Sequence, residues 1–252
     1  MSGDRVDGEF RAADWDGYRM ATRDPFAALE SLDAEIALVD DALAALVARG
    51  MIPHARHDRE RFAAHRAAVR AAFEIPWTAI TPRQERLIWA LSAIKRPQRM
   101  VAAGVFCGFT FICNAGAAVG PGATYQAEDL VGVEIKAEEA ERAERNVRLI
   151  DPTGVARVIA EDAVEVVADY PGAIDLLYLD ANGDRGRGKG IYLEILEAAY
   201  DRLKPGALVL AHNSVNCAEK LADYLAFVRD PAHMTASVNI IIDPEGLEVS
   251  AR

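Results

Sequence analysis

The chain has 252 residues, of which 51% are hydrophobic and 27% charged, so it can bury a full core and is neither disordered nor collagen-like. Its formal net charge of -11 would repel a phosphate backbone or an anionic lipid surface, which excludes nucleic acid and membrane as expected partners. The sequence shows no apolar run of about 18 residues, no secretory signal pattern and no C-x-x-C pair. We therefore expect a cytoplasmic protein without a disulfide framework.

The N-terminal region begins with a polar segment, residues 1–23, which predicts either a disordered arm or a lid over a site. A helix is then expected from Asp24, as its N-cap, with Pro25 in the first turn and Gly50 at the end. Apolar residues in this helix recur at spacings of three and four, which favours either packing on the same domain or a homodimer contact. They are Leu29, Leu32, Ile36, Val39, Leu43 and Leu46.

Two more helices are expected before the pattern changes. One covers about residues 57–74, and the next begins after Thr81, where Thr81 and Gln84 form a capping box. We expect the chain to divide into an N-terminal arm with helices, residues 1–76, and a ligand-binding domain, residues 77–252.

From residue 100 onward, short apolar runs alternate with helical patterns. This alternation predicts crossover units and hence an α/β, Rossmann-like fold: a seven-stranded, mostly parallel sheet with helices on both faces and an N-terminal helical extension. The turn Asp243-Pro-Glu-Gly246 predicts a terminal antiparallel hairpin. The expected strands cover about residues 100–104, 129–135, 156–159, 174–180, 207–211, 235–242 and 246–250.

Polar residues and glycines follow the first five predicted strands. Ligands of an open parallel sheet bind outside the carboxyl ends of its strands. After the first strand, the glycines of Gly104-Val-Phe-Cys-Gly108-Phe-Thr110 let the backbone approach a ligand and let a helix begin at once. Glu134 after the second strand can accept hydrogen bonds from a ribose, and Asp162 after the third can accept one from an adenine amino group. With Asp180, His212 and Asn213 after the later strands, these residues predict a pocket for an adenosine with a positively charged tail.

Further motifs give the chain a resemblance to a known family. Thr81-Pro-Arg-Gln84 precedes the first strand, Leu179-Asp180-Ala181 ends the fourth, and Leu203-Lys-Pro-Gly206 precedes the fifth. From about residue 80 to its end, the chain resembles the class I methyltransferases that use S-adenosylmethionine (SAM), and it is similar to the catechol and caffeoyl-coenzyme-A type of small-molecule O-methyltransferase. The resemblance implies SAM as cosubstrate, a small-molecule acceptor and a homodimer. It implies that the cofactor is bound by Gly104, Phe106, Gly108, Thr110, Glu134, Asp162, Ala163 and Asp180.

The chain departs from that family at its metal site and at its catalytic lysine. The family's divalent-metal triad, two Asp and one Asn, falls on Asp180, His212 and Asn213. Because magnesium prefers oxygen ligands, we expect no functional metal here. The family's lysine falls on Gly183, which opens a glycine-rich stretch to Gly190.

That stretch contains Arg185, Arg187 and Lys189. It predicts either a floppy surface loop or a basic lid that recruits a carboxylate-bearing acceptor. With the lysine missing, His212 is the candidate base, assisted by Asp180 and Asn213, and its alternative is a buried core histidine.

The function expected from the sequence is methyl transfer to a small molecule, in secondary metabolism. Two alternatives stay open. If the arm closes a small acceptor site, SAM could react with itself to give azetidine-2-carboxylate and methylthioadenosine. If the chemistry has been lost, the chain would be a non-catalytic SAM-binding protein.

Overall fold

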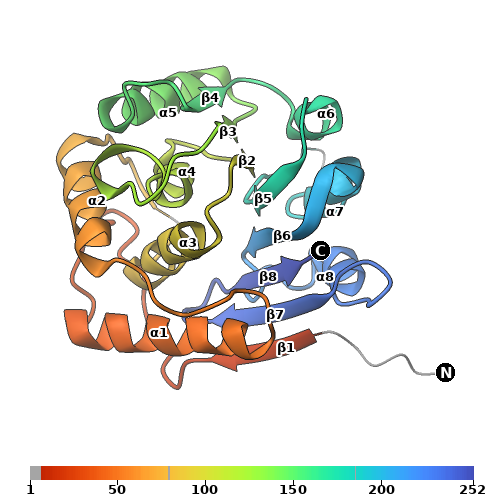
Figure 1. Cartoon of the computed structure of the whole chain (residues 1–252), viewed down its shortest axis with the longest axis horizontal. Helices are drawn as coiled ribbons and strands as arrows, with labels where there is room; N and C mark the ends of the chain where they lie inside the picture. Colours follow the sequence, from red (N-terminus) through yellow and green to blue (C-terminus); the bar gives the residue numbers. More distant parts are fainter. Residues whose placement is uncertain (1–6, 79, 185) are drawn as a thin grey trace.

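The computed structural model describes residues 7–78, 80–184 and 186–252, and one eight-stranded sheet runs through its centre (Figure 1). The strand order is β1-β7-β8-β6-β5-β2-β3-β4. Only β8 runs antiparallel to its neighbours, β6 and β7, as the hairpin prediction required. The strands are β1 Asp7–Arg11, β2 Arg99–Ala103, β3 Asp129–Val133, β4 Ala156–Ile159, β5 Ile174–Leu179, β6 Leu203–His212, β7 Ala236–Ile241 and β8 Leu247–Ala251.

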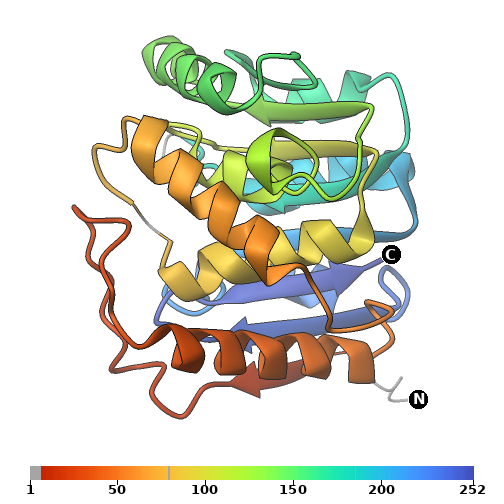
Figure 2. The ribbon, with the colours of Figure 1, turned by 60° about the vertical axis from the view of Figure 1, so that its left-hand side comes forward.

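Helices cover both faces of this sheet. Side chains alternate between the faces along each strand, so Met100 of β2 packs with α1 to α5 and Val101 packs with α6 to α8. Figure 2 shows the N-terminal helices gathered on one face. The α/β fold expected from the sequence is confirmed, and none of the described helices is long and apolar enough to cross a membrane. The helices are α1 Leu32–Ala48, α2 Arg59–Ala72, α3 Pro82–Lys95, α4 Phe109–Ala115, α5 Ala137–Ile150, α6 Ala163–Asp169, α7 Ile191–Ala199 and α8 Ala222–Val228.

The eighth strand is a correction to the sequence prediction. Residues Asp7–Arg11 were expected in a loose arm, but they form β1 and pair in parallel with β7 from Asp7 opposite Ser237 to Arg11 opposite Ile241. The segment has little strand propensity of its own, so its hydrogen bonds depend on a partner at the far end of the chain. Residues 1–6 of the predicted arm lie outside the described residues.

The first helix begins later than predicted. Asp24 accepts a hydrogen bond from the Phe26 N–H at 3.3 Å in a local turn, a common alternative to helix capping for aspartate. The N-cap of α1 is instead Ser31, whose side chain accepts from the Ala34 N–H.

The apolar positions of α1 divide along its length. Val39, Leu43 and Leu46 are fully buried in the core shared with α3, so this part of the helix packs within the chain. Leu32, in the first turn, is 59% exposed. The homodimer stays a prediction.

The N-terminus of α3 is tied to the C-terminal hairpin. Thr81 is the N-cap and accepts the Gln84 N–H at 3.2 Å, as predicted. In a complete capping box the Gln84 side chain would also bond the Thr81 backbone N–H. That part of the prediction is wrong, because the Gln84 side chain donates to Asp243 Oδ1 at 2.9 Å. Thr81 also donates to Asp243 Oδ2, at 2.6 Å. This buried set fixes α3, and with it the chain that leads into β2, against the β7–β8 turn.

Candidate active site

The turn after β2 is shaped by two glycines. Gly104 has a φ of +79°, and a Cβ there would lie 2.4 Å from Ala181 Cα, a distance real Cβ atoms do not reach. Gly108, with a φ of +85°, precedes α4, and its Cβ would lie 3.2 Å from Ala143 Cα. Only glycine combines these dihedrals with such close approaches. The loops after β2 and β5 therefore press together at the carboxyl edge of the sheet.

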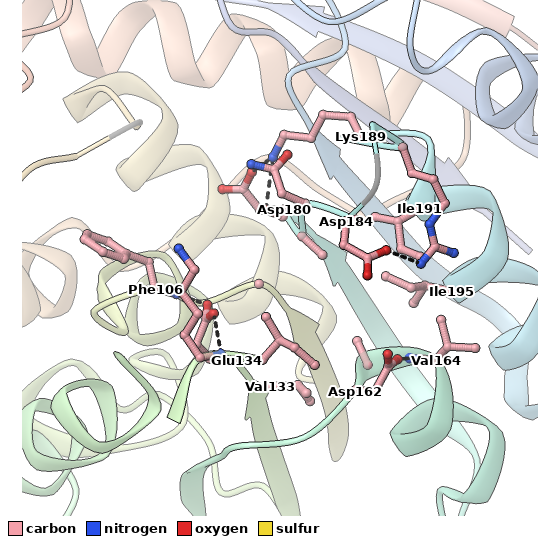
Figure 3. Close-up of a pocket in the computed structure, with 18 of the residues that line it drawn as sticks. Phe106, Val133, Glu134, Asp162, Val164, Asp180, Asp184, Lys189, Ile191 and Ile195 are labelled. Carbon is pink, nitrogen blue, oxygen red and sulfur yellow. Dashed lines mark hydrogen bonds and ion pairs between the residues drawn. The ribbon is translucent and has the colours of Figure 1, made fainter. Parts of the chain in front are cut away.

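Glu134, directly after β3, holds the turn beside it. Its Oε2 accepts the Phe106 N–H at 2.9 Å and its Oε1 accepts the Lys136 N–H at 3.1 Å (Figure 3). Phe106 has a φ of +48°, which is costly for a side chain of this size and is maintained by the surrounding contacts. A carboxylate offers about four acceptor positions, so Glu134 retains acceptor capacity for a ligand.

A cavity of about 490 Å³ opens at this edge, a size typical of small-molecule sites. One half lies at the ends of β3 and β4, where Glu134, Asp162 and Ala163 line it; the other lies at the ends of β5 and β6. The Trp77 and Phe106 rings form an apolar wall, with centroids 4.8 Å apart. Trp77 is 47% exposed and was missed from the sequence, because it lies in the connection between α2 and α3, which carries no periodic pattern.

The structure brings most of the predicted site residues to this cavity. Gly108 and Thr110 do not line it, because they belong to the start of α4, and His212 does not line it either. The predicted residues that line it are Gly104, Phe106, Glu134, Asp162, Ala163, Asp180 and Asn213.

Asp180, directly after β5, is the most heavily contacted of these residues. Its Oδ1 lies 2.5 Å from Lys189 Nζ, which also donates to the Asp180 carbonyl oxygen at 3.0 Å. Its Oδ2 lies 3.3 Å from His212 Nδ1. Burial alone would raise the pKa of Asp180, but the charges of His212 and Lys189 bring it below its usual value. The residue is therefore an ionised carboxylate inside the cavity wall.

His212 and Asn213 end β6 in different environments. The His212 ring is fully buried behind Asp180, and its Nε2 has no hydrogen-bond partner among the described residues. Asn213 reaches the cavity with a φ of +66° and donates to Glu245 Oε2 at 2.7 Å. Burial raises the pKa of Glu245. The predicted assignment of His212 as base stays a prediction, and its nearest charged neighbour is Asp180.

The glycine-rich stretch folds back on itself. Backbone hydrogen bonds of 2.9 and 3.2 Å join Gly183 and Gly188. Arg187 donates to Glu194 at 2.6 Å and to Asp184 at 3.0 Å. Lys189 turns inward to Asp180, whereas the sequence predicted either a floppy surface loop or a basic lid that recruits an external anion. Arg185 lies outside the described residues.

The donor set at the end of β5 and β6 does not fit a divalent metal. A histidine replaces one of the expected carboxylates, and an ammonium group already lies at hydrogen-bond distance from Asp180. In the described part of the chain, one group of metal-type donors lies within 4.8 Å of one another, namely His65, Glu85 and Cys113. These residues belong to α2, α3 and α4 and do not line the cavity. We derive no step through a metal.

A parallel sheet with an acid-lined crevice outside its strand ends defines a nucleotide-type binding fold. Comparison with known proteins places it further: residues 101–214 match the family model described as a methyltransferase domain. This match covers less than half of the chain and agrees with the methyltransferase class predicted from the sequence. The comparison with curated protein sequences gave no match.

Three solved structures illustrate the likeness. The O-methyltransferase TomG from Streptomyces achromogenes, in complex with SAM, is 20% identical with a TM-score of 0.55, over 78% of this chain and 90% of that one. The O-methyltransferase from Bacillus cereus, in complex with SAH (S-adenosylhomocysteine), is 15% identical with a TM-score of 0.54, over 78% and 91%. A Staphylococcus aureus protein assigned to the caffeoyl-CoA O-methyltransferases is 15% identical with a TM-score of 0.56, over 85% and 99%. At these identities the likeness shows a shared fold.

Proposed function

We propose that the chain is a SAM-dependent O-methyltransferase acting on a small-molecule acceptor in secondary metabolism. The observation that carries this proposal is Glu134. Two backbone N–H groups fix this carboxylate at a strand end, inside a cavity lined largely by the part of the chain that matches the methyltransferase domain model. Such a carboxylate can accept hydrogen bonds from both hydroxyls of a ribose.

The two halves of the cavity suggest how SAM would bind. Glu134 holds the ribose, Asp162 accepts the adenine amino group, and the Trp77 and Phe106 rings supply apolar contact beside them. The methionyl portion then extends towards Asp180, so the sulfonium lies near the ends of β5 and β6. Over the whole cavity the lining carboxylates outnumber the lining cations, which suits a cationic cosubstrate.

In the reaction, an acceptor oxygen attacks the methyl carbon of SAM in line with the carbon–sulfur bond. That bond breaks, and SAH leaves as a neutral thioether. The protein contributes position and removal of the acceptor proton. His212 is our candidate base. Because its ring does not line the cavity, the acceptor proton would reach it through Asp180, whose Oδ2 lies 3.3 Å from His212 Nδ1.

The role of His212 has a direct test. We expect His212→Ala to lower turnover by about two to four orders of magnitude while SAM affinity stays the same. Unchanged turnover in the variant would make His212 a structural residue.

The decisive experiment is to incubate the protein with SAM and a panel of hydroxyl-bearing acceptors and to identify the products. We expect SAH. Methylthioadenosine would indicate the cyclisation alternative, and no turnover despite SAM binding would indicate a binding protein. Methyl transfer is favoured over cyclisation because β1, from the arm that would have to close the site, pairs with β7, and no described residue before Trp77 lines the cavity.

A homodimer is also part of the proposal. The exposed Leu32 at the start of α1 offers an apolar contact for a second copy of the chain. Light scattering at micromolar concentration tests it, and a monomer mass would contradict it.

A further inference from the structure

Lys189 is an unusual lysine. Its residue surface is only 9% exposed, yet it lines the cavity. Its side chain reaches from the glycine-rich loop to Asp180 (Figure 3). An ammonium group has three N–H donors; the side-chain and main-chain oxygens of Asp180 accept from it, at 2.5 and 3.0 Å. The remaining donor capacity is available to a ligand in the cavity.

The other cations around the cavity are placed differently. Arg187 is held by Glu194 and Asp184, and Lys136 lies exposed at the end of β3, on the side proposed for the nucleoside. Among the described lining residues, Lys189 is therefore the buried cation in the half of the cavity at the ends of β5 and β6, where we expect the acceptor to bind. Its ammonium nitrogen lies over the Tyr192 ring, 5.4 Å from the ring centroid.

Asp180 gives this cation a fixed position. Of the three metal-triad positions, Asp180 supplies the carboxylate, and that carboxylate is the group that holds Lys189. A divalent metal at such a place binds an acceptor oxygen and stabilises its negative charge. A lysine ammonium can do the second task as a point charge, without metal coordination.

We propose that Lys189 is a built-in cation that binds the acceptor as an oxyanion, in place of the divalent metal of the methyltransferases that the chain resembles. The proposal rests on the proposed function. The acceptor hydroxyl gives its proton to a base, the resulting oxyanion lies against the Lys189 ammonium, and its electron pair attacks the methyl carbon as the carbon–sulfur bond breaks. Lys189 keeps its proton throughout. The acceptor is a phenol, which ionises on binding, or a molecule that already carries a carboxylate.

A chromogenic phenol tests this without turnover. Para-nitrophenol absorbs visible light when ionised, so its titration in the SAH-bound protein reports the pKa of the bound phenol. We expect that pKa to fall by about one unit relative to the free phenol. Benzoate, which has no phenol, tests the carboxylate source by competition. If neither probe binds to the SAH-bound protein, the proposal is wrong.

Four variants separate charge from structure. In Lys189→Met we expect the pKa shift of para-nitrophenol to vanish and benzoate to bind at least about tenfold more weakly, while Lys189→Arg keeps part of both effects. Lys189→Met combined with Asp180→Asn removes both charges, so it avoids an unpaired buried carboxylate. Lys220→Met, an exposed lysine beside Gly188, is the matched control and should behave as the unmodified protein.

SAM binding by calorimetry distinguishes this proposal from the proposed function. If SAM does not bind the unmodified protein, the proposed function fails. If SAM binds but Lys189→Met retains the phenol shift, only the role of Lys189 fails. Tighter SAM binding by Lys189→Met would also overturn it, because Lys189 would then compete with the amino group of SAM for Asp180. Loss of turnover in excess chelator that magnesium restores would show that a metal does this work.

Discussion

Two regions of this protein bury ionisable groups, and they differ in the balance of acidic and basic side chains. The first, which we name the helical ion-pair cluster, consists of Glu35, Arg66, Glu85 and Arg86, on α1, α2 and α3. Two carboxylates meet two guanidinium groups there, with Arg66 at 2.9 Å from Glu35 and 2.7 Å from Glu85, and Arg86 at 2.6 Å from Glu35. The second region is the crevice at the strand ends, where carboxylates outnumber cations.

The difference indicates what marks a ligand site. In the helical ion-pair cluster the charges satisfy one another and hold three helices together. In the crevice, Glu134 is fixed by backbone N–H groups rather than by a cation, and Asp162 only caps α6. These carboxylates keep acceptor capacity facing a cavity. Buried charge alone is therefore a poor sign of function, whereas an excess of one sign around a cavity is a good one.

The largest expected effect comes from unbalancing the helical ion-pair cluster. Glu35→Gln removes the carboxylate that both arginines contact, and an uncompensated buried charge costs about 3–5 kcal/mol of unfolding free energy. Urea denaturation measures it. Asp40→Asn, which removes an ion pair with the exposed Arg59, is the control and should cost less than about 1 kcal/mol. An equal loss of unfolding free energy in both variants would contradict the prediction, because the helical ion-pair cluster would then contribute no more than an exposed ion pair.

A second test uses pH. Burial raises the pKa of Glu85 to about 7, from an ordinary value of 4.5. The folded protein thus holds this proton more tightly than the unfolded chain, so the stability it contributes is present below about pH 4.5 and is lost as pH rises to about 7, a change of about 3 kcal/mol.

We expect Glu85→Gln to remove this pH dependence. The measurement is the difference in unfolding free energy between variant and unmodified protein at about pH 5 and about pH 8. Burial also lowers the pKa of His65 to about 3, which makes stability fall below about pH 6.5. His65 is present in both proteins, so the difference isolates Glu85. A difference that does not vary with pH would contradict the prediction.

In the crevice the expected effect is on binding. Glu134→Gln replaces charged acceptors by one neutral oxygen, so SAM should bind about tenfold or more weakly, with a loss of about 1.5–3 kcal/mol. Calorimetry measures the affinity, and Glu141→Gln, an exposed glutamate on α5, is the control. Unchanged SAM affinity in Glu134→Gln would remove the ribose assignment.

The smallest effect is expected at Arg187. Its ion pairs with Asp184 and Glu194 are exposed, and such pairs contribute less than about 1 kcal/mol. Arg187→Met should therefore change the KM of an anionic acceptor by less than about threefold. A larger increase in KM would favour the basic lid expected from the sequence.

The sheet domain was predictable because its signals are local. Each strand from β2 to β7 contains a short apolar run and is followed by a helical period or by the hairpin turn. The place of Glu134 and Asp162 in the crevice could be predicted from their positions directly after strands, since the carboxyl ends of parallel strands meet at one edge of the sheet. The predictions failed where such local signals are missing. β1 depends on β7 for its pairing, so its own sequence does not indicate a strand. Asp24 forms a local turn instead of capping the first helix.

The contacts of Lys189 could not be predicted in the same way. Nine positions separate it from Asp180, and the backbone pairing of Gly183 with Gly188 decides which side chains of the loop face inward. Trp77 was missed for a similar reason, because its place beside Phe106 depends on how the connection between α2 and α3 crosses the strand ends. Sequence identified the acids of the site, and the folded loops supplied its cation and its aromatic wall.

The pairing of β1 with β7 has a consequence for the order of events during synthesis. β1 is made before the other strands of this sheet, but its partner β7 is made after all of them except β8, with Asp7 opposite Ser237. Until β7 and β8 have been made, β1 cannot dock, and until β1 docks, β7 presents an open edge of unpaired backbone groups to other chains. Docking of β1 is thus a late step that closes this edge against aggregation, and contacts so distant in sequence form slowly. Removing β1 should leave the crevice intact and make the newly folded protein prone to self-association through β7.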